Sequence, residues 1–110
     1  MNEINPETLE KSRKVIYVCA PLKGDIAANI ESARGHCKKI IEAGHYPFSL
    51  HLALDRVLDD TDPEQRKKAL QMGLRMLEFC NEVWVFGDAV SEGMKKEIEA
   101  ASRAGIPVVF

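Results

Sequence analysis

The hydrophobic and polar positions of this chain follow two periods in turn, which predicts strands separated by helices. Runs of β-branched and aromatic residues favour strands at residues 14–19, 45–50, 82–86 and 106–110. Between these runs, apolar residues recur every three or four positions, as they do along one face of a helix. This second pattern predicts helices over residues 26–43, 63–80 and 92–104, with a short additional helix at 52–58.

Capping residues mark where the predicted helices begin and end. Asp25, Asp62 and Ser91 are N-cap residues by type and position, and a proline follows Asp62 at the first helical position. Gly44 and Gly105 follow the last periodic residues of the first and last helix, where a left-handed glycine commonly ends a helix. The helix that begins after Asp62 should continue to about residue 80.

Strands that alternate with helices over this length predict a three-layer α/β sandwich. We expect a small parallel sheet of four to five strands, Rossmann-like or flavodoxin-like, with right-handed crossovers. Pro47 indicates that the second strand lies at an edge or ends there. In such sheets ligands bind beyond the carboxyl ends of the strands, where the strand order reverses. If the first and third strands are neighbours, the loops after Cys19 and Gly87 form one pocket.

The helix that begins after Ser91 carries a carboxylate on its apolar side. Met94, Ile98 and Ala101 form an apolar stripe, and Glu97 lies three residues after the first of them and four before the last. A buried charge without a partner is costly, so this side chain must be hydrogen-bonded, paired or chemically employed. A purely structural hydrogen-bond network is the alternative to a catalytic role.

Composition narrows the class of protein. The 110 residues fit one domain, 1–13 forming a polar arm with a short helix at 6–11 and 14–110 the folded domain. A content of 45% hydrophobic and 29% charged residues is that of a soluble globular protein. The net charge of −2 argues against a nucleic-acid partner, and we find neither a membrane-spanning run nor a signal peptide. Three separated cysteines, Cys19, Cys37 and Cys80, predict reduced core thiols in a cytoplasmic protein rather than a zinc site.

Two motifs resemble a known family when they are taken together. They are YVCAPLKG at residues 17–24 and SEGMKKE at residues 91–97, with further matches at 44–47, 80–81 and 105–107. In this order and spacing the chain resembles the nucleoside 2-deoxyribosyltransferase-like family, and is closest to its small, often phage-encoded, uncharacterised branch. That family includes transferases that move 2-deoxyribose between bases, and hydrolases that cut the N-glycosidic bond of deoxynucleoside monophosphates.

The resemblance implies a role for each matching residue. Glu97 matches the nucleophilic glutamate and Tyr17 the tyrosine that orients it, so these two are the implied catalytic residues. Ser91 and Gly93 begin a helix, where backbone N–H groups bind a phosphate or a sugar hydroxyl. The implied substrate-binding residues are Ala20, Pro21, Lys23, Gly24, Asn29, His51, Ser91 and Gly93. The family further implies a nucleoside or nucleotide ligand, no cofactor or metal, and a homodimer or larger homo-oligomer.

The chain also departs from the family pattern. Many catalytic members carry an aspartate that helps the base to leave, and here that position is Gly73. Lys95 stands where the catalytic members show a second glycine. Loss of a general acid lowers the rate by about two to four orders of magnitude. Asp55, Asp59 or Asp88 could substitute, and the sequence does not decide between them.

The sequence is therefore compatible with three functions, of which the first is an enzyme that cleaves or transfers the N-glycosidic bond. The second is a non-catalytic nucleotide-binding module on the same scaffold, and the third is a structural, oligomer-forming domain with a vestigial pocket.

Plain structural roles also remain open for most of these side chains. Ser91 could be an N-cap that binds no ligand, and Lys23 an exposed loop lysine. His51 and Asp55 stand one helical turn apart, but two ligands do not make a metal site. The remaining expectations are surface or cap positions for His36 and His45, a solvated helix face for Lys95 and Lys96, and core positions for Trp84 and Phe86.

Overall fold

A computed structural model describes residues 13–21, 24–59 and 61–110 of the chain. The predicted arm at 1–13 and its short helix lie outside these ranges, apart from Arg13. Lys23 also lies outside them, so its predicted role is not tested.

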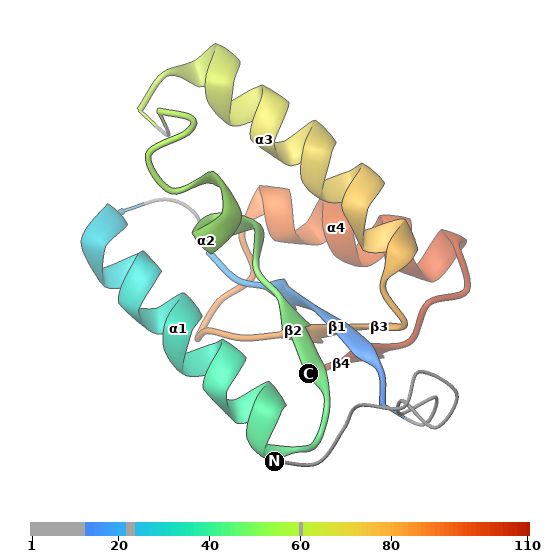
Figure 1. The fold of residues 1–110 in the computed structure, drawn as a ribbon. Coiled ribbons are helices and arrows are strands. Elements are labelled where there is room, and N and C mark those ends of the chain that lie inside the picture. The colour runs from blue at the N-terminus through green and yellow to red at the C-terminus, as the bar shows by residue number, and fades with distance from the viewer. Residues whose placement is uncertain (1–12, 22–23, 60) are drawn as a thin grey trace.

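The core of the molecule is a four-stranded parallel sheet (Figure 1). Its strands are β1 (Val15–Cys19), β2 (Tyr46–Phe48), β3 (Glu82–Val85) and β4 (Val108–Val109), in the spatial order β2-β1-β3-β4. β1 and β3 are therefore neighbours, and β2 is an edge strand, as predicted. Both outer strands are shorter than expected. Each is paired on one side only, and a proline, which lacks a ladder N–H, lies inside β2 at Pro47 and directly before β4 at Pro107.

Helices cover both faces of the sheet. Figure 1 shows α1 (Ile26–Glu42) on one side, and α3 (Pro63–Met76) with α4 (Glu92–Arg103) on the other. The alternation of side chains along β1 explains the two layers, because Ile16 and Val18 pack toward α1 whereas Tyr17 and Cys19 pack toward α4. The three-layer α/β sandwich predicted from the sequence is thus confirmed.

The predicted caps form. Asp25 accepts a hydrogen bond from the backbone N–H of Ala28 (3.1 Å), Asp62 from that of Glu64 (3.1 Å), and the Ser91 hydroxyl from Met94 N–H (3.2 Å). Gly44 and Gly105 follow α1 and α4 with φ of 90° and 72°, which are left-handed values.

Three local predictions need correction. α3 ends at Met76, and its last turn tightens into the 3₁₀ helix η1 (Leu77–Phe79), whereas one helix to residue 80 was expected. The short helix α2 is Leu50–Leu54, because Ser49 caps it by accepting from Leu52 N–H. The apolar positions that recur at helical spacing along α1 include both Ile40 and Ile41, but Ile41 is 58% exposed, since it lies 100° around the helix from the fully buried Ile40.

No helix among the described residues is long and apolar enough to cross a membrane. All three cysteines are free thiols.

Candidate functional site

A cavity of about 310 Å³ lies at the carboxyl end of β1, bordered by α2, α3 and α4. We call it the main cavity. Residues singled out from the sequence that line it are Tyr17, Ala20, His51, Ser91, Gly93 and Glu97. The loops after β1 and β3 meet beside it, where Pro21 packs against Gly87, which has φ of 104°. The main cavity differs from the predicted pocket, because Ala20 is the one described residue of these two loops that lines it, and its other walls come from β1, α2, α3 and the start of α4.

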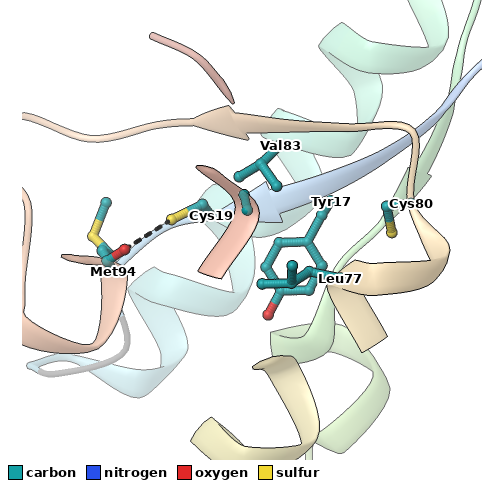
Figure 2. Close-up of a cluster of buried hydrophobic side chains, with 7 residues drawn as sticks. Tyr17, Cys19, Leu77, Cys80, Val83 and Met94 are labelled. Carbon is teal, nitrogen blue, oxygen red and sulfur yellow. Dashed lines mark hydrogen bonds between the residues drawn. The ribbon is translucent and has the colours of Figure 1, made fainter. Parts of the chain in front are cut away.

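Each carboxylate oxygen of Glu97 accepts a hydrogen bond. Its side chain is only 9% exposed, the Tyr17 hydroxyl donates to Oε2, and the Cys19 thiol lies 3.7 Å from Oε1 as a donor. We call Tyr17, Cys19 and Glu97 the carboxylate cluster. Figure 2 shows Tyr17 and Cys19 projecting from β1 toward Leu77 and Met94, which pack around them. Each carboxylate oxygen keeps a second lone pair beyond these bonds.

The local sequence explains this geometry. Tyr17 and Cys19 are two residues apart on β1 and so project from the same face of the sheet. Met94, Glu97 and Ala101 are the buried residues of α4, which confirms that the glutamate lies on the apolar stripe. Cys19 lies in the core, as predicted from the sequence, but its contact with Glu97 was not predicted. Its spacing from Tyr17 was the available signal.

Burial determines the protonation of the cluster. It raises the pKa of Glu97 to about 7, although the hydrogen bonds from Tyr17 and Cys19 act in the opposite direction. Burial, followed by the negative charge of Glu97, raises the pKa of both Tyr17 and Cys19. The hydroxyl and the thiol therefore stay protonated and act as donors, while the carboxyl group is divided between its two forms near neutral pH.

The backbone of α3 packs against the carboxylate cluster at Gly73. A Cβ atom at Gly73 would lie 2.6 Å from the Tyr17 hydroxyl oxygen, 3.1 Å from Oε2 of Glu97 and 3.1 Å from Cδ2 of Leu50. Real Cβ atoms essentially never approach other atoms to 2.6 Å. The position that carries an aspartate in catalytic members of the resembled family therefore has no room for a side chain here.

Basic side chains from two helices line the main cavity, which was not predicted from the sequence. They are Arg66 and Lys67 of α3 and Lys96 of α4. Lys96 is exposed, as expected of a solvated face, but it also borders the cavity. Within the described part of the chain, none of the three forms an ion pair, whereas Lys95 pairs with Glu92 at 3.2 Å.

The packing of α3 on α4 brings Arg66 close to the start of α4. Leu70 faces Gly93, and Gly73 faces Glu97, so the two helices run in the same direction with these residues in register. Arg66 lies one turn before Leu70 and therefore beside the start of α4. Arg66 and the first turn of α4, which is the positive end of that helix dipole, both line the main cavity.

A second cavity of about 210 Å³, the side cavity, adjoins the first through a shared residue. His51 lines both, whereas Asn29, Asp55 and Asp59 line only the side cavity. Pro21 and Gly24 line neither, and Asp88 likewise borders neither cavity. Six of the predicted site residues thus line the main cavity, and Asn29 lines the side cavity.

The remaining side chains with possible chemistry have structural surroundings. His36 stacks on Phe86 with ring centroids 4.1 Å apart, and His45 packs edge-on against Trp84. Trp84 and Phe86 pack on the α1 side of the sheet, as expected for core residues. In the described ranges, no three histidine, cysteine, aspartate or glutamate side chains come together in a group that could hold a metal ion.

A parallel sheet of order β2-β1-β3-β4 between α-helical layers defines a Rossmann-like α/β fold of the 2-deoxyribosyltransferase type. The 2-deoxyribosyltransferase from Bacillus psychrosaccharolyticus superposes with a TM-score of 0.64 and 19% identity, over 86% of this chain and 69% of that one. At this identity the likeness shows the fold alone. Residues 14–110 match the profile of DUF7768, a domain of unknown function, and the chain belongs to that family. No curated protein sequence matches the chain.

Proposed function

We propose that this protein cleaves the N-glycosidic bond of deoxynucleosides or their 5′-monophosphates, with Glu97 as nucleophile. The observation that carries the proposal is a carboxylate, nine-tenths buried, that faces a 310 Å³ cavity and is held by two donors. A cavity of this volume is within the usual range of small-molecule sites. The resemblance of the SEGMKKE and YVCAPLKG motifs to the deoxyribosyltransferase-like family, in its small uncharacterised branch, supports the same reading.

The chemistry proceeds by double displacement. A lone pair of the Glu97 carboxylate attacks C1′ of the sugar, the bond from C1′ to the base breaks, and a glycosyl ester forms on the protein. Water then attacks C1′ and releases the sugar in hydrolysis, or a second base does so in transfer. The hydrogen bonds from Tyr17 and Cys19 fix the carboxylate and limit its rotation.

The basic side chains that line the main cavity favour the monophosphate. Arg66, Lys67 and Lys96 supply cationic groups, and the first-turn N–H groups of α4 lack partners within the helix. The Ser91 hydroxyl already accepts from Met94 N–H, so its contribution to a phosphate would come through the backbone at the start of the helix. A 5′-phosphate at this end leaves the sugar over Glu97, because that residue lies one turn further along α4 than Gly93.

A panel of deoxynucleosides and their 5′-monophosphates, with free base followed by chromatography, tests the proposal. We expect base release by the wild-type protein and a loss of about 10³-fold or more in Glu97→Ala. Glu99→Ala is the matched control, since Glu99 is exposed on the outer face of the same helix. Equal base release by wild type and Glu97→Ala would refute the assigned nucleophile.

A non-catalytic nucleotide-binding module is the second candidate. The observation that favours it is the contact of Gly73 with the carboxylate cluster, which leaves no space for the acid found in catalytic relatives. Thermal stabilisation by a nucleotide without any base release would identify the module.

Assembly and location complete the proposal. We infer a homodimer or larger homo-oligomer from the family resemblance, and a cytoplasmic location from the three separated cysteines. Sedimentation of the purified chain tests the assembly, and a monomer at all concentrations would contradict it.

A further inference from the structure

The two carboxylate oxygens of Glu97 have different neighbours. Oε2 accepts from the Tyr17 hydroxyl and also packs against α3, because the Cβ position of Gly73 lies 3.1 Å away from it. Oε1 lies 3.7 Å from the sulfur of Cys19. A thiol is a weaker donor than a phenol hydroxyl, so the lone pairs of Oε1 are less engaged than those of Oε2. Of the two oxygens, Oε1 is therefore the better nucleophile.

The surroundings of Cys19 make its thiol a donor. The side chain is fully buried, and burial, followed by the negative charge of Glu97, raises the pKa of the thiol, so the sulfur keeps its proton at neutral pH. Cys19 does not line the main cavity, whereas Glu97 does. The thiol can therefore act on a substrate only through the carboxylate.

A second acceptor lies within reach of the same thiol. The carbonyl oxygen of Met94 is 4.0 Å from the Cys19 sulfur, and Figure 2 shows this contact as a dashed line. A carbonyl oxygen has two lone pairs, so the Met94 oxygen can accept the thiol proton beside its bond within helix α4. Rotation about the Cβ–Sγ bond of Cys19 turns the proton from one acceptor to the other. The buried donor thus has a partner in both positions.

We propose that Cys19 is a positioning residue that presents Oε1 of Glu97 to C1′ of the sugar and releases it as the ester forms; this inference rests on the proposed function. A lone pair of Oε1 forms the bond to C1′, and the electron pair of the C1′–N bond leaves with the base, which takes a proton from water. Because Oε1 loses its negative charge, the thiol proton turns to the Met94 carbonyl. When water attacks C1′ and gives its proton to solvent, Oε1 regains the electron pair and the thiol turns back.

The S–H stretching band of Cys19 in infrared difference spectra tests the pairing without any substrate. An S–H band lies at lower frequency when the thiol donates to a charged acceptor, and all three cysteines are free thiols. We expect the Cys19 band to move to higher frequency as the pH falls through about 7, because protonation of Glu97 removes the charge from its acceptor. Cys80 is the matched control, since its thiol lies in the same buried cluster but contacts the Met76 carbonyl at 3.8 Å. Cys19→Ala and Cys80→Ala assign the two bands.

Kinetics of the same two variants test the role in the reaction. Cys19→Ala should lower kcat for a deoxynucleoside 5′-monophosphate by about tenfold, the equivalent of one ordinary hydrogen bond, and leave KM within about twofold. The acid limb of the kcat/KM profile should move to higher pH by about half a unit to one unit, because one bond that stabilises the carboxylate is lost. Cys80→Ala should leave kcat, KM and the acid limb as in wild type.

The other titratable and charged side chains around Glu97 are the same in both variants. Tyr17 of β1 contacts its carboxylate, and α3 presents Gly73, which has no side chain. Those that line the main cavity beside it are His51, Arg66, Lys67, Glu92 and Lys96. A change in Cys19→Ala that is absent from Cys80→Ala therefore belongs to the Cys19 thiol.

A Cys19 band that does not respond to pH, or equal changes in kcat and pH profile for the two variants, would overturn the proposal. A rise in KM at unchanged kcat would do the same. If Cys19→Ala does not fold, Cys37→Ala and Cys80→Ala assign the other two bands, and the wild-type Cys19 band still decides the pairing. If the band responds to pH but wild type releases no base, the thiol pairs with Glu97, whereas the proposed function fails and the positioning role with it.

Discussion

Replacing Glu97 by glutamine should make the protein more stable at alkaline pH, because it removes a buried acid that resists ionisation. Glutamine has nearly the same shape as glutamate. Its amide oxygen can accept from the Tyr17 hydroxyl, and its amide nitrogen can face the Cys19 sulfur. The substitution therefore leaves the packing in place and removes the titration.

The sign follows from the direction of the pKa shift. Burial raises the pKa of Glu97 from 4.5 to about 7, so between these values the unfolded chain releases a proton that the folded protein keeps. The contribution of this group to stability is fully present below about pH 4.5 and is lost as the pH rises through about 7. Between about pH 5 and about pH 8 this shift costs the wild-type protein about 2 to 3 kcal/mol.

Urea unfolding at these two pH values measures the effect. The difference in unfolding free energy between Glu97→Gln and wild type should become more favourable to the variant by about 2 to 3 kcal/mol from pH 5 to pH 8. Taking this difference cancels the other titrating groups, which both proteins share. Glu99→Gln on the exposed face of the same helix should show a difference that changes by less than about 0.5 kcal/mol. A pH-independent difference for Glu97→Gln would refute the burial argument.

Three further perturbations follow from the same packing. Gly73→Ala should lower the melting temperature, because the added methyl group overpacks the carboxylate cluster at a cost of about 1–3 kcal/mol. Gly35→Ala should instead raise the melting temperature by several degrees, because Gly35 lies within helix α1 and has no atom within 4 Å of its Cβ position. Ser91→Ala should destabilise the chain by about 1 kcal/mol in urea unfolding through loss of the α4 cap, and an unchanged midpoint would contradict that cap. Arg66→Gln should raise KM for a 5′-monophosphate by about tenfold and leave KM for the nucleoside unchanged. Lys68 lies outside both cavities, so Lys68→Gln should leave both KM values unchanged.

The sequence predicted the parts of the fold that depend on local chemistry. Caps at Asp25, Asp62 and Ser91 were found because an N-cap is a short-range hydrogen bond between residues two or three positions apart. The burial of Glu97 was found because helical period alone places it between Met94 and Ala101. These features need no knowledge of which elements meet.

Features that depend on how elements pack were not predictable from periodicity. The sequence predicts the helix α3, but only its register against α4 brings Arg66 to the main cavity and Gly73 against Tyr17 and Glu97. Gly73 could be noted as a departure from a family pattern, yet its contact with the carboxylate cluster required coordinates. The position of His51 between two cavities likewise depends on where α2 begins, which was two residues earlier than predicted.

The helix and strand boundaries that failed have a common physical cause. Ends of elements are decided by competing local bonds, as at Met76, where the last turn of α3 tightens before β3. Ile41 shows the same limitation for burial, since hydrophobicity alone does not show which of two adjacent isoleucines faces the sheet.

Trapping of the glycosyl ester tests the central claim most directly. A 2′-deoxy-2′-fluoroarabinosyl nucleoside 5′-monophosphate carries an electron-withdrawing fluorine that slows breakdown of the ester, so the intermediate should accumulate. Intact-protein mass spectrometry should show one added fluorosugar phosphate, and peptide mapping should place it on Glu97, with no adduct in Glu97→Gln. An adduct on another residue, or base release without any adduct and undiminished in Glu97→Gln, would contradict the account.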